Sequence, residues 1–169
     1  KQQLWVRAFN NEIDNLIDYV ILDFNTFDGI NQNVARARIR GIEAGYEYID
    51  QDWQFRAEAL SQEPEDRDSG ETLLRRAEES LSASLVRKFT SHELGLDMLS
   101  TGERSDYGFP SATRLPGYTL FNLTARVSLG NSWWLQGKVE NLLDKQYQTV
   151  SGYTTSGRGV YLSVNYRSF

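Results

Sequence analysis

Cysteine is absent from this sequence of 169 residues, which also holds only one histidine, one methionine and three prolines. Without cysteine there is no disulfide framework, no cysteine-ligated zinc site and no thiol nucleophile. Long apolar runs are missing too, since no stretch of about 18 apolar residues occurs, and the sequence contains no candidate transmembrane helix. A membrane-spanning β-barrel stays open, because its strands need only about ten residues of alternating polarity, a signal that the mean hydropathy of −0.53 averages away.

Positive charge is in the minority, with 18 lysines and arginines against 23 aspartates and glutamates and a net charge of −5. Nucleic-acid binding relies on a basic surface that neutralises phosphates, so we exclude nucleic acid as a partner. The nucleotide-binding glycine motifs and the Gly-x-Ser-x-Gly nucleophile motif are absent as well. The single histidine, His92, stands in the turn-like segment TSHE, where we expect a solvent-exposed side chain. We therefore predict no catalytic residue, no metal site and no enzyme activity.

What the sequence has in quantity is alternation of apolar and polar residues, together with an aromatic content of 12%. Period-two alternation interrupted by turn residues is typical of β-strands that have one apolar face. Eight such strands can be placed, the first of them with an irregularity at 10–15. We predict an all-β fold of antiparallel strands near 2–24, 35–49, 53–61, 77–89, 94–98, 121–129, 133–141 and 160–169.

The predicted connections alternate in length. Short turns at one end of a barrel and long loops at the other are the pattern of outer-membrane β-barrels, whose turns are periplasmic and whose loops are extracellular. Several strands reach about ten residues, which is longer than the five or six usual in soluble sheets. We therefore favour a transmembrane β-barrel, with a soluble β-sandwich binding module as the alternative. The short connections fall at 50–52, 90–93 and 130–132, and the long ones at 24–33, 62–72, 101–117 and 142–157.

Aromatic residues flank the expected membrane zone, as the interfacial girdles of a barrel do. Beside the short turns they are Trp53, Phe89, Trp133 and Trp134, and toward the long loops they are Tyr19, Tyr107, Tyr118 and Tyr161.

Arginines and glutamates occur at alternate positions of neighbouring predicted strands. We expect their opposite charges to lie side by side on the polar inner wall of a barrel. A solvated face of an open sheet is the alternative for this set, which comprises Arg36, Arg38, Arg40, Glu43, Glu47, Arg56 and Glu58.

Exposed aromatic and arginine side chains in the long loops are the candidate ligand-binding residues. They offer a large contact area and planar hydrogen bonding, which suit the capture of a large amphipathic ligand. Girdle positions in contact with lipid headgroups are an equal alternative for each of them. The set is Arg75, Tyr107, Phe109, Arg114, Tyr153 and Arg158.

The acidic segment EDRDSGE at 65–71 places Asp66, Asp68 and Glu71 around Gly70, as a calcium loop would. An EF-hand needs a further oxygen ligand before the glycine and a glutamate six residues after it, and both are missing. We expect a mobile acidic surface loop, with calcium binding as the lesser alternative.

The segment VENLLDKQYQTVSGYTTSGRGVYLSVNYRSF closely resembles the carboxyl end of TonB-dependent outer-membrane receptors. Four further segments, GYTTSGR, LLRRA, NEIDNLIDY and ARIRGIEA, are similar to segments of the cobalamin receptors within that family. The resemblance runs over nearly the whole chain. In the family, Asn-Leu-(Leu/Phe)-Asp-Lys-x-Tyr precedes the last strand, and the residues that match it here are Asn141, Leu142, Asp144, Lys145 and Tyr147.

This resemblance implies that residues 1–169 form the C-terminal portion of a receptor β-barrel domain, with the plug domain and the TonB box absent. It implies active transport across the outer membrane of a Gram-negative bacterium, with cobalamin as the ligand and no cofactor. By position it places Arg75 and Tyr107 at the ligand. The implied partners are the lipid outer membrane, TonB through the missing N-terminal region, and the barrel assembly machinery through the C-terminal strand. A siderophore receptor is the alternative within the family.

Two expectations concern the ends of the sheet. A self-contained eight-stranded barrel with an adhesion or structural role would pair its first strand, 4–9, with its last, 160–166, whereas a part of a larger barrel would leave both unpaired. In the last strand Phe169 is out of phase with Tyr166. We therefore expect either an extra residue or a bulge near Arg167 and Ser168, or a Phe169 that is out of register with the strand.

Overall fold

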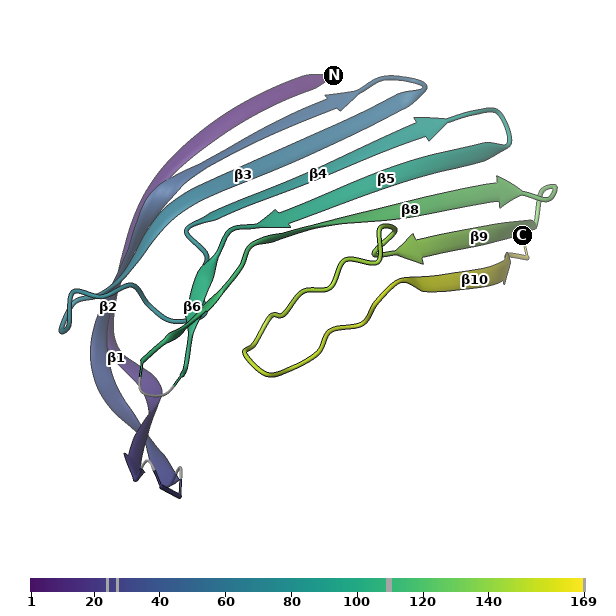
Figure 1. Ribbon diagram of the computed structural model, residues 1–169. Coiled ribbons are helices and arrows are strands. Elements are labelled where there is room, and N and C mark those ends of the chain that lie inside the picture. Colours follow the sequence, from purple (N-terminus) through teal and green to yellow (C-terminus); the bar gives the residue numbers. More distant parts are fainter. Residues whose placement is uncertain (24, 27, 109–110, 169) are drawn as a thin grey trace.

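The computed structural model describes residues 1–168 except 24, 27, 109 and 110, and it leaves out the side chains at 16, 18–21 and 31–35. In this part of the chain every regular element is a β-strand, and no helix is long and apolar enough to cross a membrane. Eight strands form one antiparallel sheet and two short strands form a second, smaller sheet (Figure 1). The all-β prediction is confirmed.

The large sheet follows the chain in order, each strand pairing with its neighbours in an antiparallel direction. Its strands are β1 (Gln2–Asp23), β2 (Asp28–Ile49), β3 (Trp53–Asp66), β4 (Glu79–Lys88), β5 (His92–Thr101), β8 (Tyr118–Ser128), β9 (Trp133–Glu140) and β10 (Gly159–Tyr166). The small sheet lies within the connection between β5 and β8 and consists of β6 (Arg104–Asp106) and β7 (Thr113–Leu115).

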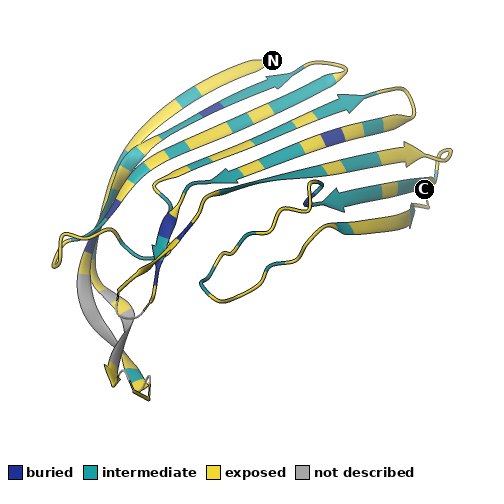
Figure 2. Ribbon diagram, viewed as in Figure 1, coloured by how far each residue is buried: buried dark blue, intermediate teal, exposed yellow. Residues whose placement is uncertain are grey.

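One face of the large sheet is apolar from β1 to β10. The register brings apolar residues of neighbouring strands opposite one another, so that they form continuous rows across the sheet. Val6 on β1 and Leu162 on β10 are 68% and 72% exposed, and both edge strands are largely exposed in Figure 2. In a membrane barrel such a face contacts lipid. One row consists of Leu4, Tyr46, Ala57, Ala83, Met98 and Phe121.

The sheet is open at β1 and β10. Among the described residues β1 pairs with β2 alone and β10 pairs with β9 alone, and no pairing joins 4–9 to 160–166. Figure 1 shows the strands as a curved wall with β1 and β10 at its two edges. The alternative of a self-contained eight-stranded barrel is therefore wrong, because closure requires that pairing.

The two longest strands contain the irregularity that the sequence predicts. The register of β1 against β2 shifts between Ile13 and Leu16, and Asn15 between them has a φ of 59°. Asparagine is one of the few residues that adopts this left-handed conformation at low cost. The predicted irregularity at 10–15 is confirmed.

Two predicted loops are shorter than expected. Pairing continues to Asp23 and Asp28, so most of the predicted loop 24–33 belongs to β2. Likewise β3 runs to Asp66, inside the predicted loop 62–72. Polar composition misled the prediction, because polar strands that extend beyond the apolar rows still form the backbone ladder. The short turns near 50–52, 90–93 and 130–132 are confirmed, and the connection 101–117 contains the hairpin of β6 and β7.

The predicted stacking of opposite charges is confirmed, but it occupies two faces. On the polar face Arg56 pairs with Glu47 at 2.8 Å, and Arg7 pairs with Glu43. Arg36, Arg38 and Arg40 lie on the same face of the sheet as Ile42, because alternate residues of β2 point to the same side. They stand beyond the apolar rows of that face. The prediction that all these charges stack on a single polar inner wall is therefore wrong for three pairs, Arg36–Asp68, Arg38–Glu65 and Arg40–Glu63.

The aromatic girdles are confirmed only in part. Trp133 lies on the apolar face and packs on Tyr166 with ring centroids 4.7 Å apart. Its neighbour Trp134 points to the polar face, as do Tyr118 and Tyr161, because adjacent residues of a strand face opposite sides. The girdle position expected for these three residues is wrong, and the side chain of Tyr19 lies outside the described residues.

The last strand is regular as far as it is paired. Tyr166 lies opposite Trp133, and the Arg167 N–H donates to the Ser132 carbonyl at 2.9 Å. The irregularity expected near Arg167 and Ser168, or an out-of-register Phe169, stays a prediction, because Phe169 lies outside the described residues.

Candidate functional site

Three connections at the long-loop end meet at the carboxylate of Asp106, which terminates β6 and is 0% exposed. Its Oδ1 accepts hydrogen bonds from Arg75 Nε at 2.5 Å and from the Tyr107 N–H at 2.8 Å. Its Oδ2 accepts the Ser151 N–H at 2.6 Å. Arg75 comes from the connection between β3 and β4, and Ser151 from the one between β9 and β10. One buried side chain thus joins the bases of three loops.

Burial and hydrogen bonding act on Asp106 in opposite directions. Burial by itself raises the pKa of this carboxyl, but the hydrogen bonds from the Ser151 N–H, from Arg75 and from the Tyr107 N–H outweigh it. The pKa of Asp106 therefore lies below its ordinary value. Because the folded pKa is depressed, the ionised junction is stabilising above the ordinary aspartate pKa of about 3.9. That contribution is lost as the pH falls through the folded pKa.

Arg75 and Tyr107, the two residues placed at the ligand by family resemblance, lie together. The Arg75 guanidinium stacks over the Tyr107 ring with 5.0 Å between its Cζ and the ring centroid. The Arg75 backbone N–H donates to the Ser105 carbonyl at 2.7 Å, and its φ is 61°, so the backbone is held in an uncommon conformation. The Arg75 side chain is 45% exposed. Tyr107 is 39% exposed, so the pair presents a fixed cation and part of an aromatic ring at the long-loop end.

The other predicted ligand-binding residues are dispersed. Arg114 on β7 pairs with Glu103 and lines a hollow of about 490 Å³ with Arg76 and Arg104. Tyr153 is 70% exposed in the last connection. Phe109 lies outside the described residues. Ligand binding by any of these residues stays a prediction.

Arg158 and the motif near the last strand have a structural role in the fold. The Arg158 N–H donates to Asp144 Oδ1 at 2.8 Å, which ties the end of the last connection to its beginning. Asn141 is buried, and its amide side chain exchanges two hydrogen bonds with the backbone of Lys145. Asn141 and Asp144 both have positive φ, of 48° and 52°. These contacts fold the turn after β9.

The acidic segment at 65–71 uses its carboxylates within the fold. Asp66 Oδ1 accepts the N–H groups of Asp68 and Ser69 and shapes the turn after β3. Hydrogen bonds from the Arg36 N–H and the Arg36 guanidinium lower the pKa of Asp68. Among the described residues no three histidine or acidic side chains gather as a metal site would require.

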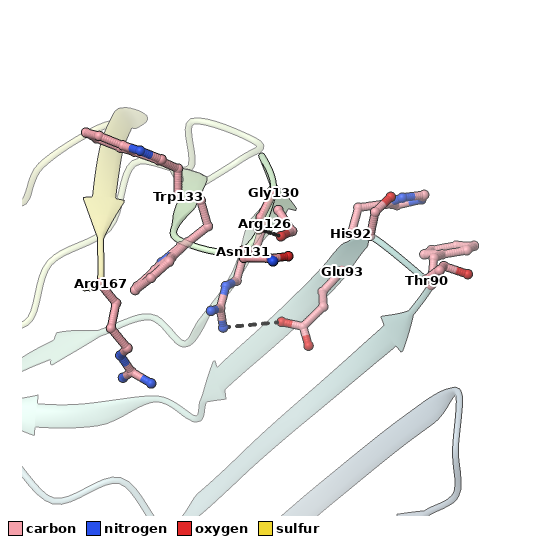
Figure 3. Close-up of a pocket in the computed structure, with 12 residues that line it drawn as sticks. Thr90, His92, Glu93, Arg126, Gly130, Asn131, Trp133 and Arg167 are labelled. Atoms are coloured by element: carbon pink, nitrogen blue, oxygen red, sulfur yellow. Dashed lines mark hydrogen bonds and ion pairs between the residues drawn. The ribbon is translucent and has the colours of Figure 1, made fainter. Parts of the chain in front are cut away.

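A second hollow, of about 350 Å³, lies at the short-turn end of the sheet (Figure 3). Arg126 and Arg167 both approach the Trp134 ring, with Cζ-to-centroid distances of 5.0 and 6.0 Å. Glu93 faces Arg126 at 3.9 Å. His92 is exposed, as predicted, and stacks on Phe89 with ring centroids 4.2 Å apart. The sequence prediction missed this cluster because its members lie on different strands.

The comparison with known families settles the relationship of the chain. Residues 1–142 match the family described as TonB dependent receptor-like, beta-barrel. The chain belongs to this family. Its members are receptors of the Gram-negative outer membrane that work with TonB, so the predicted family, barrel fold and location are confirmed.

Solved structures show the same fold at low sequence identity. The copper transporter OprC superposes with a TM-score of 0.79 and 16% identity, over 98% of this chain and 28% of that one. The ferripyoverdine receptor of Pseudomonas aeruginosa gives 0.77 and 20%, over 98% and 25%. The ferric-catecholate import receptor Fiu of E. coli K12 gives 0.76 and 18%, over 98% and 25%. The chain thus spans about a quarter of the length of these proteins.

Proposed function

We propose that this chain forms the C-terminal barrel portion of a receptor that takes up a ferric siderophore or a similar metal chelate through the outer membrane. The observation that carries this proposal is the Arg75–Tyr107 pair, fixed by Asp106 at the long-loop end. A permanently charged guanidinium stacked on an aromatic ring suits an anionic, partly aromatic chelate. The similar solved structures support it, since their names refer to copper, ferripyoverdine and ferric catecholate.

Cobalamin is the second candidate ligand, and its support is the resemblance of GYTTSGR and LLRRA to segments of cobalamin receptors. The folded structure gives the first of these segments another task. Thr155 Oγ1 donates to the Tyr147 carbonyl at 2.7 Å, and the Arg158 N–H donates to Asp144. A segment that is needed to fold the loop does not by itself select a ligand. We therefore favour a metal chelate over cobalamin.

The remainder of the proposal concerns the whole receptor. The plug domain and the TonB box belong to the part of the receptor outside residues 1–169, TonB acts through that part, and the assembly machinery recognises β10. Uptake requires ligand capture and gated passage, so the proposal includes no catalytic step and no cofactor.

Direct binding tests the ligand class. The full-length receptor in proteoliposomes would be titrated with ferric catecholate, ferric hydroxamate and ferric carboxylate chelates and with cyanocobalamin. We expect at least one ferric chelate to bind more than about tenfold tighter than cyanocobalamin, a difference of about 1.4 kcal/mol. The variant R75Q should weaken that binding, whereas the control R67Q should not, because the Arg67 side chain pairs with Glu12 on β1, at 3.7 Å, and not with Asp106. Tighter binding of cyanocobalamin would overturn the proposal.

A further inference from the structure

Asp106 holds one particular edge of the Arg75 side chain. The contact is through Nε, at 2.5 Å, and the same oxygen also accepts the Tyr107 N–H at 2.8 Å. Arg75 is thereby oriented by the residue immediately before the ring on which it stacks. The end-on edge of the guanidinium, formed by Nη1 and Nη2, is a different edge from the one that faces Asp106.

The orientation of Arg75 is fixed at three points. Its backbone N–H donates to the Ser105 carbonyl, its Nε donates to Asp106, and its guanidinium lies over the Tyr107 ring. The Asp106 carboxylate is in turn fixed from the other side by the Ser151 N–H, in a different connection. A long side chain held in this way loses less conformational freedom when a ligand binds than a free arginine would.

We propose that Asp106 is a positioning residue, which holds Arg75 so that its two Nη groups meet a planar anionic group of the ligand. This inference rests on the proposed function and names the ligand chemistry at that site, a carboxylate or catecholate oxygen pair. Such groups bind end-on to the two Nη groups as a bidentate pair, which a lysine cannot reproduce. Asp106 itself does not touch the ligand, because it is fully buried.

The isosteric variant D106N separates charge from shape. An asparagine has one acceptor oxygen and one amide that only donates, so at least one of the present donors would face another donor. Those donors are Arg75 Nε and the N–H groups of Tyr107 and Ser151. Arg75 would also lose its carboxylate partner. A hydrogen bond between charged groups, such as the one from Arg75 to Asp106, contributes enough free energy for its loss to weaken ligand binding by about tenfold or more.

The test uses a double-mutant cycle on the full-length receptor in proteoliposomes, with a ferric tris-catecholate, ferric citrate and cyanocobalamin as probes. D106N, R75Q and R75K should each weaken binding of the anionic chelate by about tenfold or more. Because Asp106 acts through Arg75, the double variant D106N/R75Q should bind no more weakly than R75Q alone. The matched control D52N, an exposed aspartate in the short turn before β3, should bind like the wild type.

A second readout needs no ligand. Trypsin cleaves after arginine, and a released Arg75 should be cut faster in D106N than in the wild type or in D52N. Full affinity in D106N, or losses that simply add in the double variant, would show the inference to be wrong while the proposed function stands. Failure of the wild type to bind any probe would instead overturn the proposed function, and the cleavage rates would still decide whether Asp106 holds Arg75.

Discussion

Two glycines of β2 make room for aromatic side chains of β1 on the polar face. Gly45 lies opposite Trp5, and a Cβ at Gly45 would lie 2.3 Å from Trp5 Cε2. Gly41 lies opposite Phe9, and a Cβ there would lie 2.4 Å from the Ser61 carbonyl oxygen on β3 and 2.9 Å from Phe9 Cζ. Large aromatic rings thus cover glycine backbone across the strand pair, an arrangement that also pins the register of β1 on β2.

The variant G45A tests this packing. The added methyl group must displace the Trp5 ring, and overpacking of this kind costs roughly 1–3 kcal/mol. We expect the full-length barrel carrying G45A to unfold at a lower temperature, as measured by its heat-dependent migration in SDS gels. G137A is the matched control, because a Cβ at Gly137 meets nothing within 4 Å. Equal unfolding temperatures for the two variants would contradict the argument.

Single residues show how far the sequence leads in the candidate site. Arg75 and Tyr107 could be selected from the sequence by family resemblance, and the structure brings them together. Asp106 could not, although it stands next to Tyr107, because its importance arises from the approach of three connections. Alternation of polar and apolar residues reports on neighbouring strands, and it contains no information on how long loops meet.

Among the elements, the turn after β9 is held by three hydrogen bonds of Asn141. Asn141 Oδ1 accepts the Lys145 N–H at 2.8 Å and its Nδ2 donates to the Lys145 carbonyl at 3.0 Å. Its own N–H donates to Asn122 Oδ1 on β8 at 2.9 Å. The motif Asn-Leu-Leu-Asp-Lys that identifies the family in the sequence therefore encodes the fold of this turn.

Replacement of Asn141 should destabilise the last connection. N141A loses two hydrogen bonds and places alanine at a φ of 48°, where a Cβ costs roughly 1–2 kcal/mol. N141G loses the same hydrogen bonds without the backbone cost, so its effect should be smaller. Proteolysis of the 141–158 connection in the full-length receptor measures both, and we expect N141A to be cut fastest, then N141G, then the wild type. A faster rate for N141G would contradict this order.

The strands themselves were predictable wherever one face meets lipid, because the apolar rows impose strict alternation. Their outer ends were not, since the start of β2 at 28–33 and the end of β3 at 62–66 are mostly polar at successive positions and give no such pattern. There Arg38 and Arg40 pair with Glu65 and Glu63 and carry the sheet past the predicted loop boundary. Cross-strand charge pairs of this kind are visible in the sequence only after the register is known.

At the scale of the whole molecule, the large sheet has two unpaired edges and one broad apolar face. β1 and β10 each have one partner strand among the described residues, and their backbone groups on the outer side are unsatisfied within the sheet. On the apolar face Leu4, Val6 and Leu162 are 73%, 68% and 72% exposed. A soluble β-sandwich would bury such residues in a core, which rules out that alternative for this sheet.

These features predict the behaviour of residues 1–169 on their own. Unpaired edge strands template pairing with other chains, and an exposed apolar face adds a hydrophobic driving force. The isolated chain should therefore aggregate when it is transferred from denaturant into detergent-free buffer, as measured by light scattering and sedimentation. Detergent should reduce the aggregation without abolishing it, because detergent covers the apolar face but leaves the edges of β1 and β10 unpaired. A stable, monodisperse monomer in plain buffer would contradict this prediction, because it would require the strand edges or the apolar face to be covered, and in this sheet both are exposed.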